Sequence, residues 1–107
     1  MDDSTFESLA EGTLARLQAQ IEEALDEIDV ELRGGILTLE LDDGRQYVIN
    51  KHTPNRQIWL SSPLSGAAHF AYDAQGRVWR STRGEVLLHP LLAAELSELT
   101  GQSVVLD

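Results

Sequence analysis

Apolar residues recur at steps of three and four through the first quarter of the chain, which is the spacing of one face of an amphipathic helix. Ser4 and Glu7 fit the S-x-x-E capping box that often begins such a helix. The pattern therefore predicts a helix over residues 4–26. Its stripe, with one threonine among apolar members, comprises Phe6, Leu9, Thr13, Leu14, Leu17, Ile21, Ala24, Leu25 and Ile28.

Short runs in which apolar and polar residues alternate follow this helix, as in strands with one buried face. Asp43-Gly44 lies between two of these runs and predicts a hairpin with a type I′ turn, in which both central residues have positive φ. In the last run Trp79 lies next to Val78, so the pattern leaves the direction of Trp79 open. The runs cover residues 29–32, 37–42, 46–50, 56–61, 69–72 and 77–81.

A second apolar stripe near the end of the chain predicts a helix that begins near Pro90 and ends at Gly101. Proline suits the first turn of a helix, where its missing N–H is no loss, and glycine suits the position just past the end. The tail, residues 103–107, is expected to pack back on the fold or to fray. The stripe comprises Leu88, Leu91, Leu92, Leu96 and Leu99.

The expected order of elements is one helix, five or six consecutive strands and one helix. Strands joined by turns of two to four residues run antiparallel. Two amphipathic helices suffice to cover one face of such a sheet and leave the other face in water. We therefore predict an α+β fold, a two-layer sandwich, with a single domain over residues 1–107.

The run TPNRQIWLSSP, residues 53–63, places a tryptophan on the open face of this sheet. If Ile58 and Leu60 face the core, Trp59 faces water. Two interpretations stay open: Trp59 packs on cross-strand neighbours and stiffens the sheet, or it anchors a binding partner. The predicted open face comprises Thr38, Glu40, Val48, Asn50, Gln57, Trp59 and Ser61.

The net charge of −10 is concentrated in the first two-fifths of the chain. Residues 1–43 hold 13 of the 18 acidic residues and only two of the eight basic ones. Direct nucleic-acid binding needs a basic surface, so this distribution argues against it. It favours cations or a basic protein as the partner.

The densest acidic run is IEEALDEIDVEL, residues 21–32. In a helix that reaches residue 26, Glu22–Asp26 and Glu23–Glu27 are like-charge pairs, each of which costs about 0.2–0.5 kcal/mol. They also lie at the negative end of the helix dipole. Such a run is usually a solubilising face, but its unfavourable position suggests a surface for hard, oxygen-preferring cations, bound weakly, or for a basic patch on a partner.

Other kinds of site find little support. The chain has no cysteine, which excludes disulfides, thiolate metal sites and a cysteine nucleophile. His52 in a loop, His69 in a strand and His89 at a helix start are interpreted as structural or solvent-exposed. No Ser-His-Asp arrangement, H-E-x-x-H or glycine-rich phosphate loop occurs, so we expect no enzyme. The start of the chain lacks a secretory or transit signal, and we expect a cytoplasmic protein.

Three segments together resemble one known family. The run YVINKHTPNRQIWLSSPLSG, residues 47–66, carries the pattern N-[KR]-x-x-P-x-x-Q-[IV]-W-L-[SA]. The acid-rich first helix before GGILTLEL and the closing LLAAELSEL follow the same order. Over nearly its whole length the chain resembles the frataxin family, including the bacterial members called CyaY.

The resemblance implies an α/β sandwich and a role in iron–sulfur cluster assembly, as an iron-binding regulator or iron chaperone. It implies an open sheet face that contacts the complex of cysteine desulfurase and scaffold protein through Asn50, Gln57 and Trp59. His52 and His69 depart from eukaryotic relatives, so this contact is expected to be weaker or pH-sensitive. The resemblance also implies an acidic ridge that binds Fe(II) and Fe(III) weakly and docks on a basic patch of the desulfurase, here Glu22, Glu23, Asp26, Glu27, Asp29 and Glu31.

Two alternative functions stay open. One is a ferroxidase-type enzyme that oxidises Fe(II) and stores the mineral as an oligomer, and the other is an adaptor that works without iron. We expect a monomer, with iron-dependent oligomers and binding of other divalent cations as further possibilities. Asp42 and Asp43 lie in a turn that varies in the family and receive no role.

Overall fold

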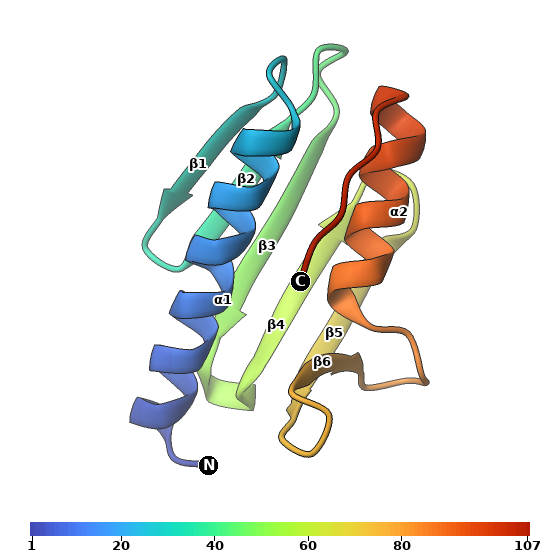
Figure 1. The fold of residues 1–107 in the computed structure, drawn as a ribbon. Helices are drawn as coiled ribbons and strands as arrows, with labels where there is room; N and C mark the ends of the chain where they lie inside the picture. The colour runs from blue at the N-terminus through green and yellow to red at the C-terminus, as the bar shows by residue number, and fades with distance from the viewer.

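Two helices lie side by side on one face of a six-stranded sheet in the computed structural model, which describes residues 1–107 (Figure 1). Neighbouring strands are antiparallel and follow one another in chain order. The predicted α+β two-layer sandwich is confirmed. The elements are α1 (Asp3–Ala24), β1 (Asp29–Arg33), β2 (Ile36–Glu40), β3 (Gln46–His52), the single 3-10 turn η1 (Thr53–Asn55), β4 (Gln57–Ser62), β5 (Gly66–Asp73), β6 (Val78–Ser81) and α2 (Leu88–Thr100).

Both ends of α1 differ from the prediction. The N-cap is Asp2, whose side chain accepts a hydrogen bond from the Thr5 N–H at 2.8 Å, so Ser4 and Glu7 form no capping box. At the other end the backbone is already extended at Leu25, and the helix stops at Ala24 rather than at residue 26. The side chain of Leu25 is nevertheless buried. Because Leu25 packs on the core from a loop, the apolar stripe continues past the end of the helix.

The first two hairpins have different turns. Gly34 and Gly35 form the two-residue turn between β1 and β2, and both have positive φ, 58° and 78°. Glycine adopts such a backbone conformation without steric strain. Within the β2–β3 turn only Gly44 has positive φ, and the Gly44 N–H donates to the Leu41 carbonyl at 3.0 Å. The predicted hairpin is confirmed there, but the predicted type I′ turn is wrong. Asp43 instead caps a longer loop by accepting from the Arg45 N–H at 3.0 Å.

The core lies between the two helices and the inner face of the sheet. Ile58 and Leu60 are buried there, as the alternation predicts. Trp79, whose direction the sequence left open, also points inward and donates its indole N–H to the Thr13 hydroxyl at 3.0 Å. Neither helix is long and apolar enough to cross a membrane.

The end of the chain packs between the two helices (Figure 1). Helix α2 begins at Leu88, slightly before Pro90, and ends at Thr100; Gly101 follows as its C-cap with a positive φ of 72°. The following tail buries Val104 and Leu106. These contacts show that the tail packs back on the fold rather than frays.

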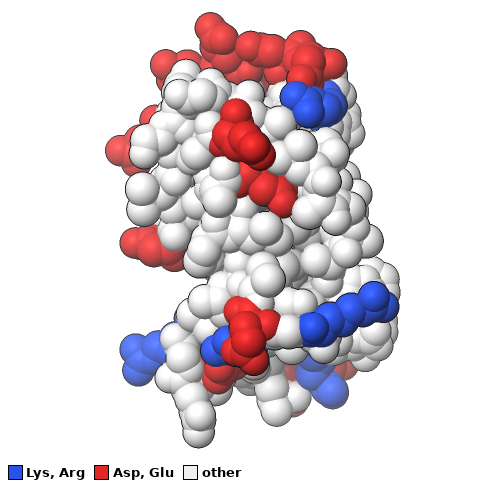
Figure 2. Space-filling model, turned by 90° about the vertical axis from the view of Figure 1, so that its right-hand side faces the viewer, with Lys and Arg blue, Asp and Glu red and all other residues white.

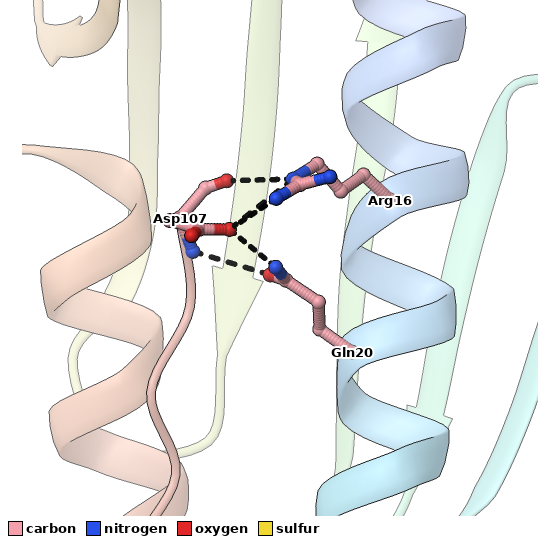
Figure 3. Close-up of polar contacts among 3 residues, drawn as sticks. All are labelled: Arg16, Gln20 and Asp107. Carbon is pink, nitrogen blue, oxygen red and sulfur yellow. Dashed lines mark hydrogen bonds and ion pairs between the residues drawn. The ribbon is translucent and has the colours of Figure 1, made fainter.

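Polar contacts to α1 hold the last residue of this tail, Asp107. Its carboxylate accepts hydrogen bonds from Arg16, at 2.8 Å for the Nη2 donor, and from the Gln20 amide (Figure 3). The Asp107 N–H in turn donates to Gln20 Oε1 at 3.1 Å. The tail is thus tied to α1 as well as packed between the helices.

Candidate functional site

Carboxylates gather at the end of the molecule where α1 ends and β2 turns into β3. In Figure 2 acidic atoms cover most of the upper end, with a basic group beside them, while the lower end carries acidic and basic groups together. The antiparallel register explains part of this, because it places Asp29 of β1 directly opposite Glu40 of β2. The loop between α1 and β1 and the turn after β2 bring further acids to the same end.

One hollow at this end, of about 420 Å³, is lined by five carboxylates, and we call it the acidic groove. None of the five takes part in an ion pair within the chain. They come from the α1–β1 loop, β1, β2 and the β2–β3 turn, and all are exposed. The groove therefore presents unneutralised negative charge to the solvent. Its acidic residues are Asp26, Glu27, Asp29, Glu40 and Asp42.

The structure brings together only part of the predicted acidic ridge. Glu31 lies beside the groove, in a neighbouring hollow that it shares with Asp29 and Glu40. Glu22 and Glu23 lie on the last turn of α1 and do not line either hollow. Glu40 and the turn acid Asp42 line the groove as well, although neither was among the metal-site residues predicted from the sequence. Their place in the groove follows from the β1–β2 register, which sets Glu40 opposite Asp29, and from the position of the hairpin turn that carries Asp42.

The predicted like-charge pairs are corrected by the early end of α1. Asp26 and Glu27 lie beyond Ala24 in a loop, so they are not helical neighbours of Glu22 and Glu23. The expected cost of these pairs to helix stability does not apply. What remains is that the last turn of α1 carries acids and no base, at the end of the helix where negative charge is disfavoured.

The chemistry of the groove is that of carboxylate oxygen alone. Such ligands suit hard cations, and they also suit Lys and Arg side chains. No three histidine, aspartate or glutamate side chains in the structure are placed to hold one metal ion. The groove offers negative charge spread along a surface that several segments build.

The open face of the sheet has the predicted composition. Asn50, Trp59 and His69 form one row across β3, β4 and β5, with Asn50 and His69 the direct cross-strand partners of Trp59. In the next row Thr38, Val48 and Ser61 are partners in the same way. The sheet thus places the predicted partner-binding residues next to one another on the side away from the helices.

Trp59 lies on the open face, as the alternation predicts, but its side chain is half-buried rather than freely exposed. The His52 ring stacks on one face of the indole at a centroid distance of 3.6 Å and an interplanar angle of 9°. The His69 ring stacks on the other face at 4.2 Å and 9°. The indole N–H donates to Gln57 Oε1 at 2.8 Å. We call His52, Trp59 and His69 the imidazole–indole stack; both faces of its central ring are covered.

His52 belongs to strand β3 rather than to the predicted loop. Its Nδ1 atom is buried and has no hydrogen-bond partner. From the sequence, His52 and His69 were interpreted as structural or solvent-exposed residues, and their contact with Trp59 was not predicted. Only the β3–β4–β5 register, which sequence alternation does not specify, places one imidazole on each side of Trp59.

The lysine of the sequence motif has a structural role. Lys51 points to the helix side of the sheet, and its Nζ lies 2.6 Å from a Glu11 carboxylate oxygen and 3.7 Å from one of Glu7. The hydrogen bond to Glu11 raises the pKa of Lys51 above its ordinary value.

Burial lowers the pKa of His89 at the start of α2, which favours the neutral imidazole expected of a structural histidine. Neither His89 nor Lys51 belongs to the open face.

Comparison with known proteins gives a consistent family. A family model described as a frataxin-like domain matches residues 1–102. The chain is 37% identical over 107 residues to the iron-sulfur cluster assembly protein CyaY of Dechloromonas aromatica, with 99% of each chain covered. It is 39% identical over 112 residues to mitochondrial frataxin of Arabidopsis thaliana and 38% identical over 103 residues to the mitochondrial frataxin homolog of Schizosaccharomyces pombe. These matches cover 100% and 92% of this chain but 60% and 65% of the two mitochondrial relatives.

Solved structures show the same fold. Frataxin from Psychromonas ingrahamii matches with a TM-score of 0.88 at 28% identity, over 98% of this chain and 97% of that one. A trimeric frataxin from the yeast Saccharomyces cerevisiae, complexed with ferrous iron, matches with a TM-score of 0.66 at 40% identity, over 87% of this chain and 82% of that one.

Proposed function

Because the chain belongs to the frataxin family, we propose that it binds iron and acts on the machinery that assembles iron–sulfur clusters. The observation that carries this proposal is the acidic groove, where five carboxylates without a basic partner lie at one end of a frataxin fold. Two relatives support it by name: one is an iron-sulfur cluster assembly protein, and one was solved with ferrous iron.

Iron is the cargo of the proposed site rather than a resident cofactor. Exposed carboxylates compete with water for a hard cation, so binding is weak and leaves most of the hydration shell in place. Fe(II), Fe(III) and other divalent cations bind with little selectivity for the same reason. The proposed ligands are those acids of the predicted ridge that line the groove, Asp26, Glu27 and Asp29, joined by Glu40 and Asp42.

Two surfaces of the protein dock on the assembly complex in this proposal. The acidic ridge, Glu22, Glu23, Asp26, Glu27, Asp29 and Glu31, meets a basic patch of the cysteine desulfurase. The open face contacts the desulfurase–scaffold complex through Asn50, Gln57 and Trp59. Because the desulfurase and iron both use the ridge, each weakens the binding of the other. The protein regulates assembly in the cytoplasm without being an enzyme itself.

An anaerobic Fe(II) titration followed by amide chemical shifts tests the iron part. We expect shifts confined to residues 22–31 and 40–44, and we expect Asp29→Asn combined with Asp42→Asn to remove most of them. The matched control is Asp3→Asn with Glu85→Gln, which removes two exposed carboxylates outside the groove. Shifts spread evenly over the chain, or equal losses in both double variants, contradict the proposed iron site.

A reconstituted cluster-assembly assay tests the regulatory part. We expect the rate with purified desulfurase and scaffold to change when this protein is added and to depend on the iron level. Trp59→Ala and Glu22→Lys affect different surfaces, and each is expected to weaken a pull-down by the desulfurase–scaffold complex. Unchanged binding in both variants contradicts the docking proposal. An assembly rate that changes on addition of this protein but does not depend on the iron level favours the iron-independent adaptor.

A further inference from the structure

A second hollow adjoins the acidic groove and has a different character. It lies between the end of α1, the β2–β3 turn and the end of α2, and its volume is about 170 Å³. Four apolar side chains line it, and three carboxylates stand among the other lining residues. We call it the apolar hollow. Its apolar residues are Leu25, Ile28, Leu41 and Leu99, and its acids are Glu27, Asp42 and Asp43.

The size of the apolar hollow suits one apolar side chain. An engineered cavity of ~150 Å³ lined by aliphatic and aromatic residues takes up benzene, so a hollow of similar volume admits a leucine or phenylalanine side chain. Ile28 and Leu99 are only half-buried, which leaves apolar surface in contact with water. Covering that surface with an apolar group is favourable.

The charges around the apolar hollow define the rest of the occupant. Glu27 and Asp42 line both the hollow and the acidic groove, and neither is neutralised by a base within the chain. Only Asp43 is paired, with its Oδ2 2.7 Å from an Arg45 Nη2. A group that enters the hollow therefore has two free carboxylates beside it.

We propose that the apolar hollow and the acidic groove together bind a basic segment of a partner protein. One apolar side chain of that segment enters the hollow, and flanking Lys or Arg side chains meet Glu27 and Asp42. This inference rests on the proposed docking of the acidic end on a protein, and it adds an apolar anchor to a contact otherwise made by charge. A hydrated metal ion uses only the carboxylates and gains nothing from the apolar floor.

Two short peptides of equal charge test the apolar anchor, Lys-Arg-Leu-Lys-Arg and Lys-Arg-Ser-Lys-Arg, both capped at their ends. Affinities come from amide-shift titrations at low salt, because exposed charges are screened at high salt. We expect the leucine peptide to bind about tenfold more tightly than the serine peptide, in line with the burial of one leucine. Its shifts should include Ile28, Leu41 and Leu99.

The variant Gln102→Trp tests the location, because Gln102 is exposed and its replacement covers the hollow without disturbing the core. In Gln102→Trp we expect the affinity for the leucine peptide to fall to that of the serine peptide, while the affinity for the serine peptide stays unchanged. Gln102→Ala is the matched control and retains the tenfold difference. A second variant, Leu99→Asn, removes part of the apolar floor and should act in the same direction, with circular dichroism to confirm folding.

The outcomes separate this inference from the proposed function. Equal affinities of the two peptides, absence of binding by both, or a leucine preference that survives Gln102→Trp each overturn the apolar anchor. The Fe(II) titration of the same samples is independent of these results. If iron shifts and the iron-dependent assembly rate persist while the peptides bind equally, the proposed function stands without the anchor. If those iron effects are absent while the leucine preference follows the hollow, the anchor stands and the iron-binding role fails.

Discussion

Replacement of His69 by alanine is the most informative change on the open face. It removes the imidazole that stacks at 4.2 Å on Trp59 and leaves the His52 contact at 3.6 Å in place. A stacked ring pair contributes about 0.5–1.5 kcal/mol beyond its buried area. Because this pair is only half-buried, we expect His69→Ala to lower the free energy of unfolding by roughly 1 kcal/mol.

The same change should weaken docking on the desulfurase–scaffold complex. With one face uncovered, the Trp59 side chain regains rotamer freedom that it must lose again on binding. Immobilising one such side chain costs about 0.5–1.5 kcal/mol, which corresponds to a loss in affinity of about 2- to 13-fold. His69→Phe retains a stacked ring and should recover most of the loss. Ser61→Ala, an exposed position on the same strand, serves as the control.

Acrylamide quenching of tryptophan fluorescence reports the stack directly. Trp79 is only 2% exposed and contributes little to quenching, so the measurement follows Trp59 without a second substitution. We expect the quenching constant to rise in His69→Ala and to return in His69→Phe. Quenching that stays at the wild-type value, or an affinity that falls equally in both variants, would refute the idea that the imidazole holds the indole in place.

Three further predictions concern stability. Leu106→Ala should cost about 2 kcal/mol in urea unfolding because its side chain is buried. Arg16→Ala, which removes an exposed ion pair to the tail, should cost less than about 1 kcal/mol. A larger stability loss in Arg16→Ala than in Leu106→Ala would contradict the view that apolar contacts hold the tail. Burial and the hydrogen bond to Glu95 raise the pKa of Tyr47 above its ordinary value, so the stability that this group contributes is present below about pH 10 and lost as pH rises further. Tyr47→Phe should abolish that alkaline loss in unfolding measurements from pH 8 to 11. Burial raises the pKa of Glu95, but hydrogen bonds from Ser62 and Tyr47 outweigh burial and lower it. Its contribution is therefore present above its unfolded pKa of about 4.5 and lost as pH falls below that value, and Glu95→Gln should flatten this acid slope.

The layered fold follows from sequence periodicity because burial on one face is a local requirement. Leu37 and Leu39 alternate with polar residues, and Ile58 and Leu60 alternate with residues of the open face, since each strand has one face on the helices. The direction of Trp79 does not follow, because both Trp79 and its neighbour Val78 are apolar. The structure resolves it through a contact with distant Thr13, which the alternation of a single strand does not contain.

Features of the candidate site that depend on strand register were not predictable in the same way. The imidazole–indole stack needs β3, β4 and β5 in one particular alignment, and the acidic groove needs β1 against β2 together with a loop and a turn. Sequence alternation fixes which face a residue occupies but not which residue lies opposite. Asp26, Glu27 and Asp29 were therefore predictable as site residues from the acidic run, whereas the positions of Glu40 and Asp42 in the same groove were not.

The early end of α1 changes how the acidic run bears on function. If Asp26 and Glu27 were helical, their pairing with Glu22 and Glu23 would destabilise the fold, and that loss would itself suggest selection for binding. In the loop they are solvated and free to separate, so the fold tolerates them at little cost. The case for binding then depends on what the acids adjoin. Glu27 and Asp42 adjoin both an all-carboxylate groove and an apolar floor, an arrangement that dispersed solubilising charge does not require.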